Sequence, residues 1–284
     1  MGVTHYIGYP PGRSQLFSEK EFAETEERGL VTDFKDLKKA VREIAVISGA
    51  GLPAVILQIA HPGVGRGVGR HSNFAYRGND KEEAAVKDFV NKKHVRVNDN
   101  ATAKTYDAFD VDLQLWVAAT LYYTYVAMYE DIFGLLKPNV ADRVYQQFSV
   151  MGTALQVPLH KWPKDCAAFK VYWDDIVKNT LRITPEAQGV TNDLFSPVKY
   201  MLFWLKPLVW ATGPLHRAAA IGQLPESVLR EFGLKSTKGP KRLNKTLMVT
   251  TRAIYPLIPL PLRTMQKDYY LWLMRRKMAK WQAL

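Results

Sequence analysis

The segment from Leu113 to Leu136 constrains the fold most, because apolar or aromatic residues recur on nearly every side of it when it is drawn as a helix. These residues include Trp116, Tyr122, Tyr123, Tyr125 and Met128. Asp110 and Asp112 precede the run and are candidate N-cap residues. A helix that is apolar all round must be covered by other elements, so we predict that it lies in the centre of a helical bundle.

Other parts of the chain also carry the signals of a helical protein. Residues 18–21 form a capping box, and Trp-Pro-Lys-Asp opens an amphipathic segment over about 162–178. The sequence Pro225–Ser227 opens a short helix that Gly233 can end. Sustained period-two alternation, internal repeats and linkers are absent. We therefore predict one all-α domain over residues 1–284.

Composition excludes several classes of protein. Hydrophobic residues make up 47% of the chain, which is enough for a sizeable core, and a single cysteine, Cys166, cannot form an internal disulfide. The N-terminus lacks the apolar core of an export signal. Glycines and a proline interrupt the apolar run 44–60, and polar residues interrupt 113–129, so both fit buried helices better than membrane spans. We expect a cytoplasmic protein that can contact an intracellular membrane peripherally.

The excess positive charge is confined to the last third of the chain. Residues 199–284 hold 16 Lys and Arg against three Asp and Glu, although the net charge of the whole chain is only +12. Aromatic residues alternate with these cations, namely Phe203, Trp204, Trp210, Tyr255, Tyr269, Tyr270, Trp272 and Trp281. The mixture suits an anionic membrane surface better than a nucleic acid, which we do not expect as a partner. The alternative is a solvated helical surface whose aromatics pack inward.

His94 lies on the apolar side of a predicted helix that begins after an Asn79-Asp80 cap and covers about residues 81–97. Three valines at helical spacing share its side, with Lys93 in the same sector and Arg96 at its edge. A histidine with cationic neighbours is a suitable axial ligand for a haem, whose propionates need positive partners. The alternative is an ordinary core histidine bonded to the backbone.

Other motifs in the chain lack the neighbouring residues that their usual functions require. The run from Gly49 to Ala54 fits the dinucleotide pattern G-x-G-x-x-A, but a proline stands in the would-be helix start and βαβ alternation is missing. The alternating glycines from Gly63 to Gly69 lack the ending of a P-loop. They would let the backbone approach a flat, bulky group, or let two helices cross closely. The minimum motifs of zinc proteases, zinc ribbons and α/β-hydrolases do not occur.

Three segments in chain order carry a resemblance to a known family: 57–68 with His71-Ser72, then 90–97, then 112–121. In this order they resemble the signature segments of the MpaB-type and rubber-oxygenase (latex-clearing protein) catalytic domains. The similarity covers about residues 41–175, with a weaker one in the basic C-terminal part. It implies a globin-like helical core of about a dozen helices with a basic helical C-terminal extension.

The resemblance further implies one haem b, with iron bound by His94, and dioxygen as co-substrate. Family members known to be enzymes cleave carbon–carbon double bonds in polyisoprene or in a prenylated intermediate. Rubber oxygenases carry arginines where this chain has Asn91 and Asn98. Lys93 and Arg96 are therefore the candidate partners of the propionates.

A second departure from the family pattern lies on the central helix. Ala118 stands where many bacterial relatives have a histidine. A second iron ligand from this helix is therefore not expected, and the sixth coordination position would be open to dioxygen.

We predict a haem-dependent oxygenase that acts on a hydrophobic small molecule of secondary metabolism, prenylated or terpenoid, with cleavage of a C=C bond as one outcome. Four residues are candidate polar groups near the cofactor or substrate: His61, Arg70, His71 and Thr120. For Thr120 the alternative is a hydroxyl bonded to its own helix. Two other hypotheses stay open: a haem dehydrogenase or peroxidase, and a non-catalytic membrane-surface protein that binds haem or lipid.

Overall fold

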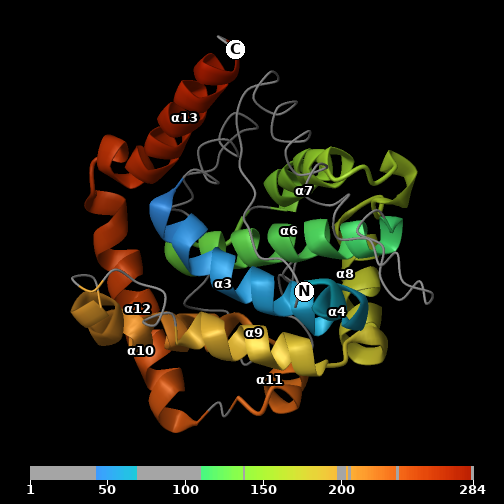
Figure 1. Ribbon diagram of the computed structural model, residues 1–284, viewed down its shortest axis with the longest axis horizontal. Coiled ribbons are helices and arrows are strands. Elements are labelled where there is room, and N and C mark those ends of the chain that lie inside the picture. Colours follow the sequence, from blue (N-terminus) through green and yellow to red (C-terminus); the bar gives the residue numbers. More distant parts are fainter. Residues whose placement is uncertain are drawn as a thin grey trace.

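The protein is built from α-helices, as the sequence predicts (Figure 1). The computed structural model describes residues 43–68, 110–136, 138–196, 203, 206–234 and 237–282, and this part of the chain contains no strand. The α-helices are α3 (Ile44–Ala60), α4 (Pro62–Val68), α6 (Val111–Phe133), α7 (Pro138–Ala154), α8 (Cys166–Asp175), α9 (Pro185–Phe195), α10 (Lys206–Gln223), α11 (Glu226–Glu231), α12 (Lys238–Ile254) and α13 (Leu260–Gln282). The predicted helix around His94 and the capping box at 18–21 lie outside the described residues.

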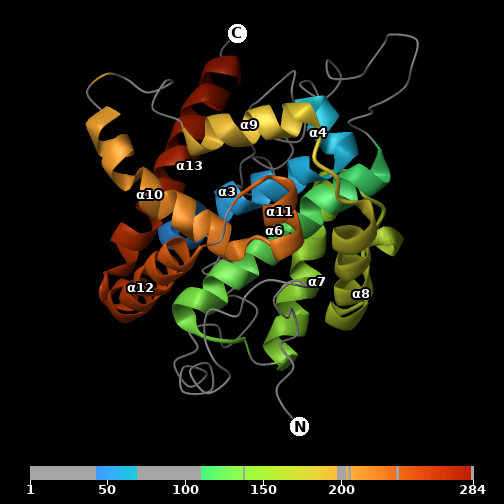
Figure 2. The same ribbon diagram turned by 90° about the horizontal axis from the view of Figure 1, so that it is seen from below.

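Helix α6 occupies the centre of the bundle (Figures 1 and 2). Sixteen of its residues are buried, among them Trp116 and Tyr122. The carboxylate of Asp110 accepts hydrogen bonds from the backbone N–H groups of the first turn, which confirms the predicted cap. The helix ends three residues earlier than predicted, because Gly134 takes a positive φ of 98° that stops it.

Helix α3 packs along α6 over much of its length, and the other helices surround this pair. Helices α9, α10 and α13 contact α3, while α7 and α12 contact α6. At the crossing of α3 and α6, Gly49 lies so close to Met128 that a Cβ at this position would stand 2.4 Å from the methionine Cε. The segment 49–54 is helical throughout, so it forms no dinucleotide-binding turn.

Aromatic rings fill the side of α6 that faces α7 and α8. The ring of Tyr122 meets those of Tyr145, Phe148 and Phe169 edge-on, with centroids 4.8–5.3 Å apart. Its hydroxyl lies 3.7 Å from the sulfur of the buried Cys166. Burial raises the pKa of the Cys166 thiol to about 12, so the thiol is uncharged at neutral pH.

The chain turns between α12 and α13 at residues 255–261, which include three prolines, and a short 3₁₀ turn covers Tyr255–Leu257. At this corner Arg263 lies 3.6 Å from the carboxylate of the buried Glu43, just before α3. The hydroxyl of Tyr255 donates to the same carboxylate at 3.0 Å. These contacts join the base of the last helix to the beginning of α3.

The described aromatics of the basic region divide between core and surface. Tyr255 is buried, whereas Phe203, Trp210, Tyr269 and Trp272 are each more than half exposed. Of the described aromatic residues that alternate with cations in the sequence, inward packing therefore explains only some. None of the described helices is long and apolar enough to cross a membrane.

Candidate functional site

His61 stands between α3 and α4, at the point where the chain leaves one helix and enters the next. Its backbone N–H donates to Gln58 O at 3.2 Å, and its own carbonyl accepts from the N–H of Gly65 at 2.8 Å. The extended ψ of 123° at His61 breaks the helix and turns the following Pro62 into α4. Both helix ends therefore fix the backbone of this half-buried histidine.

The carbonyls at the end of α3 find partners from other helices. Because His61 N–H bonds Gln58, the carbonyl of Leu57 is released from the helical pattern, and it accepts the indole N–H of Trp116 at 3.1 Å. The carbonyl of Ala60 accepts the backbone N–H of Arg182 at 3.0 Å. Arg182 follows a π-helical turn, Ile176–Thr180, that ends α8. The indole of Trp116 and the backbone of Arg182 thus both bond to the end of α3, next to His61.

The glycines of α4 permit close packing. A Cβ on Gly63 would stand 2.7 Å from a methyl group of Leu113 on α6. A Cβ on Gly65 would stand 2.7 Å from the carbonyl of Ile59 and 3.0 Å from the hydroxyl of Thr184. Of the two interpretations of the glycine series, the close approach of neighbouring segments is observed for these two positions.

The imidazole of His61 is held as a hydrogen-bond donor. Its Nδ1 accepts the backbone N–H of Gly63 at 3.2 Å, so in the neutral ring the proton is on Nε2. Burial lowers the pKa of His61 below its ordinary value of 6.5; Asp110 acts in the opposite direction and Arg66 adds to the decrease. His61 is therefore neutral at pH 7, with Nε2–H available to a ligand.

This tautomer is unsuitable for binding iron through Nε2. A metal-bound histidine nitrogen carries no proton, and its other ring nitrogen normally donates a hydrogen bond. In His61 the second nitrogen, Nδ1, accepts one instead. Iron at Nε2 would leave the ring without any proton, so His61 is arranged as a hydrogen-bond donor and not as an iron ligand.

Aromatic side chains of α6 and α8 lie beside His61. The ring of Trp116 is centred 6.4 Å from the imidazole and 5.1 Å from the ring of Trp173. The ring of Tyr123 stacks on that of Trp173, with centroids 4.3 Å apart. The sequence pattern predicted burial for Trp116 and Tyr123 but did not place them at the site, although Trp116 lies within the third signature segment. These rings bring two indole N–H groups: that of Trp116 donates to the carbonyl of Leu57, and that of Trp173 is buried without a hydrogen-bond partner among the described residues.

Thr120 is fully buried one turn further along α6. Its hydroxyl donates to the carbonyl of Val117 at 2.7 Å, which is the arrangement of the alternative interpretation. The same residue's carbonyl accepts the hydroxyl of Thr124 at 2.8 Å. The single hydroxyl hydrogen of Thr120 is thus engaged within its own helix, and Ala118 beside it is buried.

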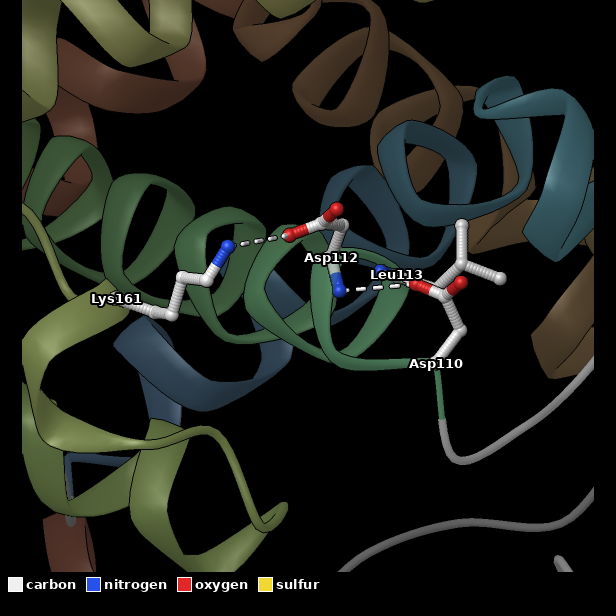
Figure 3. A network of polar contacts seen from close by, with 4 residues as sticks. All are labelled: Asp110, Asp112, Leu113 and Lys161. Atoms are coloured by element: carbon white, nitrogen blue, oxygen red, sulfur yellow. Dashed lines mark hydrogen bonds and ion pairs between the residues drawn. The ribbon is translucent and has the colours of Figure 1, made fainter.

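Two acidic groups stand at the beginning of α6 (Figure 3), and one of them, Asp110, is near enough to His61 to act on its pKa. The carboxylate of Asp110 accepts from the N–H groups of Asp112 and Leu113 at 2.9 and 3.0 Å. Asp112 lies 3.9 Å from the ammonium of Lys161. Asp110 and Asp112 therefore serve as a helix cap and an exposed ion pair.

The remaining predicted site residues lie outside the described part of the chain: Arg70, His71, Lys93, His94 and Arg96. Among the residues that are described, no cluster of three His, Cys, Asp or Glu side chains could hold a metal ion. The assignments of these five residues therefore stay predictions. A haem needs only one protein ligand to its iron, so this finding bears on clustered metal sites alone.

Comparison with known proteins assigns the chain to a class. Residues 39–253 match the family described as "ER-bound oxygenase mpaB/B'/Rubber oxygenase, catalytic domain". The protein belongs to this family of oxygenase catalytic domains, as the three signature segments predicted. An enzyme of the oxygenase class is the general function that membership supports.

Individual relatives are mycobacterial. An uncharacterised protein of Mycobacterium tuberculosis is 32% identical over 251 residues, which cover 79% of this chain and 95% of the relative. An uncharacterised protein of Mycobacterium bovis matches with the same values. No solved structure matches the chain.

We expect Gly65→Ala to lower the free energy of unfolding by about 1–3 kcal/mol, because the added methyl group meets a backbone carbonyl that cannot move aside. The matched control is Gly51→Ala in α3, where nothing lies within 4 Å of the added Cβ. That control should raise stability by up to about 1 kcal/mol, since alanine favours a helix over glycine. Urea unfolding measures both; equal effects of the two substitutions would contradict the close packing of α4.

We expect NMR titration to give His61 a pKa below 6.5, with its signal assigned by its loss in His61→Gln. Asp110→Asn should lower this pKa further, and Arg66→Gln should raise it, because each removes a nearby charge. The folded state binds the proton less readily than the unfolded chain does. Hence the contribution of His61 to stability is present above about pH 6.5 and is lost as the pH falls. A pKa above 6.5 would contradict the donor assignment.

Proposed function

We propose that this protein is a haem-dependent oxygenase that uses dioxygen on a hydrophobic small molecule, prenylated or terpenoid in character. Membership of the oxygenase catalytic-domain family over residues 39–253 carries the proposal. Two features of the described site support it: the neutral Nε2–H donor of His61 and the aromatic wall of Trp116 and Trp173 beside it.

In this proposal His94 would bind the haem iron, and Lys93 and Arg96 would pair with the propionates. The tautomer of His61 supports a ligand elsewhere in the chain, because that ring is arranged to donate. Bound haem would supply the dioxygen and one-electron chemistry that protein side chains lack.

The residues of this chain have three tasks in the proposal. His61 would donate a hydrogen bond from Nε2 to a polar atom of the dioxygen or of the substrate. Trp116 and Trp173, both buried, exclude water from the side of the site next to His61. Arg70 and His71 are proposed as further polar groups on the segment that follows α4.

The wall also bears on the choice of substrate. Buried indole and phenol rings reward apolar contact, and a buried charged substrate would need a paired group that this wall does not offer. A prenyl or terpenoid chain satisfies this requirement, whereas a small ionic substrate does not. Cleavage of a C=C bond and hydroxylation both agree with such a site, and product analysis distinguishes them.

We expect the purified protein to show a b-type haem spectrum and pyridine haemochrome, both lost or strongly shifted in His94→Ala. His160→Ala is the matched control, because His160 is exposed in the 3₁₀ turn Leu159–Lys161 and should leave the spectrum unchanged. A wild-type protein that stays colourless after haem is supplied would overturn the haem assignment. It would leave the lipid-binding alternative.

We expect His61→Gln to retain the haem spectrum and to reduce substrate-dependent oxygen uptake by about tenfold or more, because one preorganised donor is displaced. An oxygen electrode with prenylated test substrates measures the rate. Activity that requires peroxide, or an electron acceptor in place of oxygen, would identify a peroxidase or dehydrogenase instead. Unchanged oxygen uptake in the variant would remove His61 from the proposed chemistry.

A further inference from the structure

The last helix carries a stripe of large apolar side chains on its surface. Leu262, Met265, Tyr269 and Trp272 are 58%, 58%, 57% and 51% exposed. At 100° per residue they fall within a sector of about 80°, so they line one side of α13. We call these four residues the α13 stripe. Leu257, 80% exposed, stands just before the helix.

The other side of α13 is attached to the bundle. Arg263 lies 3.6 Å from the buried carboxylate of Glu43, and Thr264 is buried beside it. The guanidinium of Arg263 also lies 5.7 Å from the ring centre of Tyr255. These contacts set the rotation of the helix, so the stripe is directed away from α3. Figure 1 shows α13 leading away from the end of α12 toward the C-terminus.

Positive charge accompanies the stripe. Residues 237–282 contain 11 Lys and Arg and one acid, Asp268, whose carboxylate accepts the hydroxyl of Thr264. Arg252 and Arg263 are occupied within the fold, where they contact backbone carbonyls of α6 and the carboxylate of Glu43. Other cations of α12 and α13 are exposed, namely Lys238, Arg242, Lys245, Arg275 and Arg276. Among these cations, Arg275 and Arg276 lie on α13 itself, so the helix that carries the stripe also carries exposed positive charge.

The aromatic members of the stripe are arranged as interfacial residues commonly are. The rings of Tyr269 and Trp272 stack with centroids 6.1 Å apart, and Arg276 lies 5.4 Å from the Trp272 ring centre. Both aromatic side chains have an apolar ring and a polar tip, which suits the boundary between headgroups and acyl chains. An arginine beside them can reach the phosphate layer while its stem stays on the ring.

We propose that the α13 stripe is a docking surface for an anionic membrane. Apolar side chains beside a strong excess of cations match a surface that presents negative headgroups above hydrocarbon. A second copy of this chain fits less well, because it would bring two strongly basic helices together. The proposal concerns the surface alone and does not depend on haem or on the reaction.

The test is flotation of the full-length protein with vesicles of phosphatidylcholine alone or with about 30% phosphatidylserine. We expect binding to the anionic vesicles only, weakening as salt is raised. Substitution of the stripe by Leu262→Ser, Met265→Ser and Trp272→Ser should lower the partition coefficient about tenfold or more. Arg275→Glu with Arg276→Glu should lower it as well.

A matched control uses exposed apolar residues elsewhere. Leu159→Ser with Val171→Ser removes side chains that are 63% and 72% exposed near α8, and it should bind vesicles as the wild type does. Circular dichroism and thermal unfolding show whether each variant is folded. Equal binding to neutral and anionic vesicles, or equal losses in the stripe and control variants, would overturn the proposal. So would wild-type dimers that the stripe variant converts to monomers without vesicle binding.

Discussion

Helix α6 is stable in water only because other helices cover it on almost every side. Its 16 buried residues include groups that face in several directions, so a partner on one side alone would leave large rings exposed. Helix α3 covers one side, with Gly49 directly against Met128, and α7, α8 and α12 cover others. The bundle is thus organised around one apolar helix, and α3, α7, α8 and α12 each protect part of it.

The same packing fixes the chemistry at the end of α3. Trp116 belongs to the buried surface of α6, and its indole N–H also satisfies the carbonyl that is released where α3 ends. The break in α3 can therefore be buried without an unpaired carbonyl at Leu57. His61 stands at this break, and its Nδ1 accepts a hydrogen bond from the backbone of the next helix. The contact between α3 and α6 therefore serves both the packing of Trp116 in the core and the arrangement of His61 as a neutral hydrogen-bond donor.

Local signals in the sequence predicted the elements well. The cap at Asp110 and the short helix that ends near Gly233 depend on neighbouring residues, and both are present. The amphipathic segment predicted over about 162–178 is helical from Cys166, where Asp165 caps α8, and α8 ends at Asp175 before a π-helical turn. Pairings between distant segments could not be predicted in this way. The bond from Arg182 N–H to Ala60 O joins residues far apart in the chain, and no local pattern encodes it. Resemblance to a family, which reflects whole folds, gave the class of the protein but leaves the residues around His94 as predictions.

Cys166 has a consequence for how the core can be observed. It is the one cysteine of the chain, it is buried beside the hydroxyl of Tyr122, and burial keeps its thiol protonated. A thiol in this state reacts slowly with alkylating reagents and oxidants, because the reactive thiolate is scarce and the sulfur is covered. Labelling then requires the contact between α6 and α8 to open. The rate at which Cys166 is modified therefore measures how often the aromatic core between α6 and α8 opens.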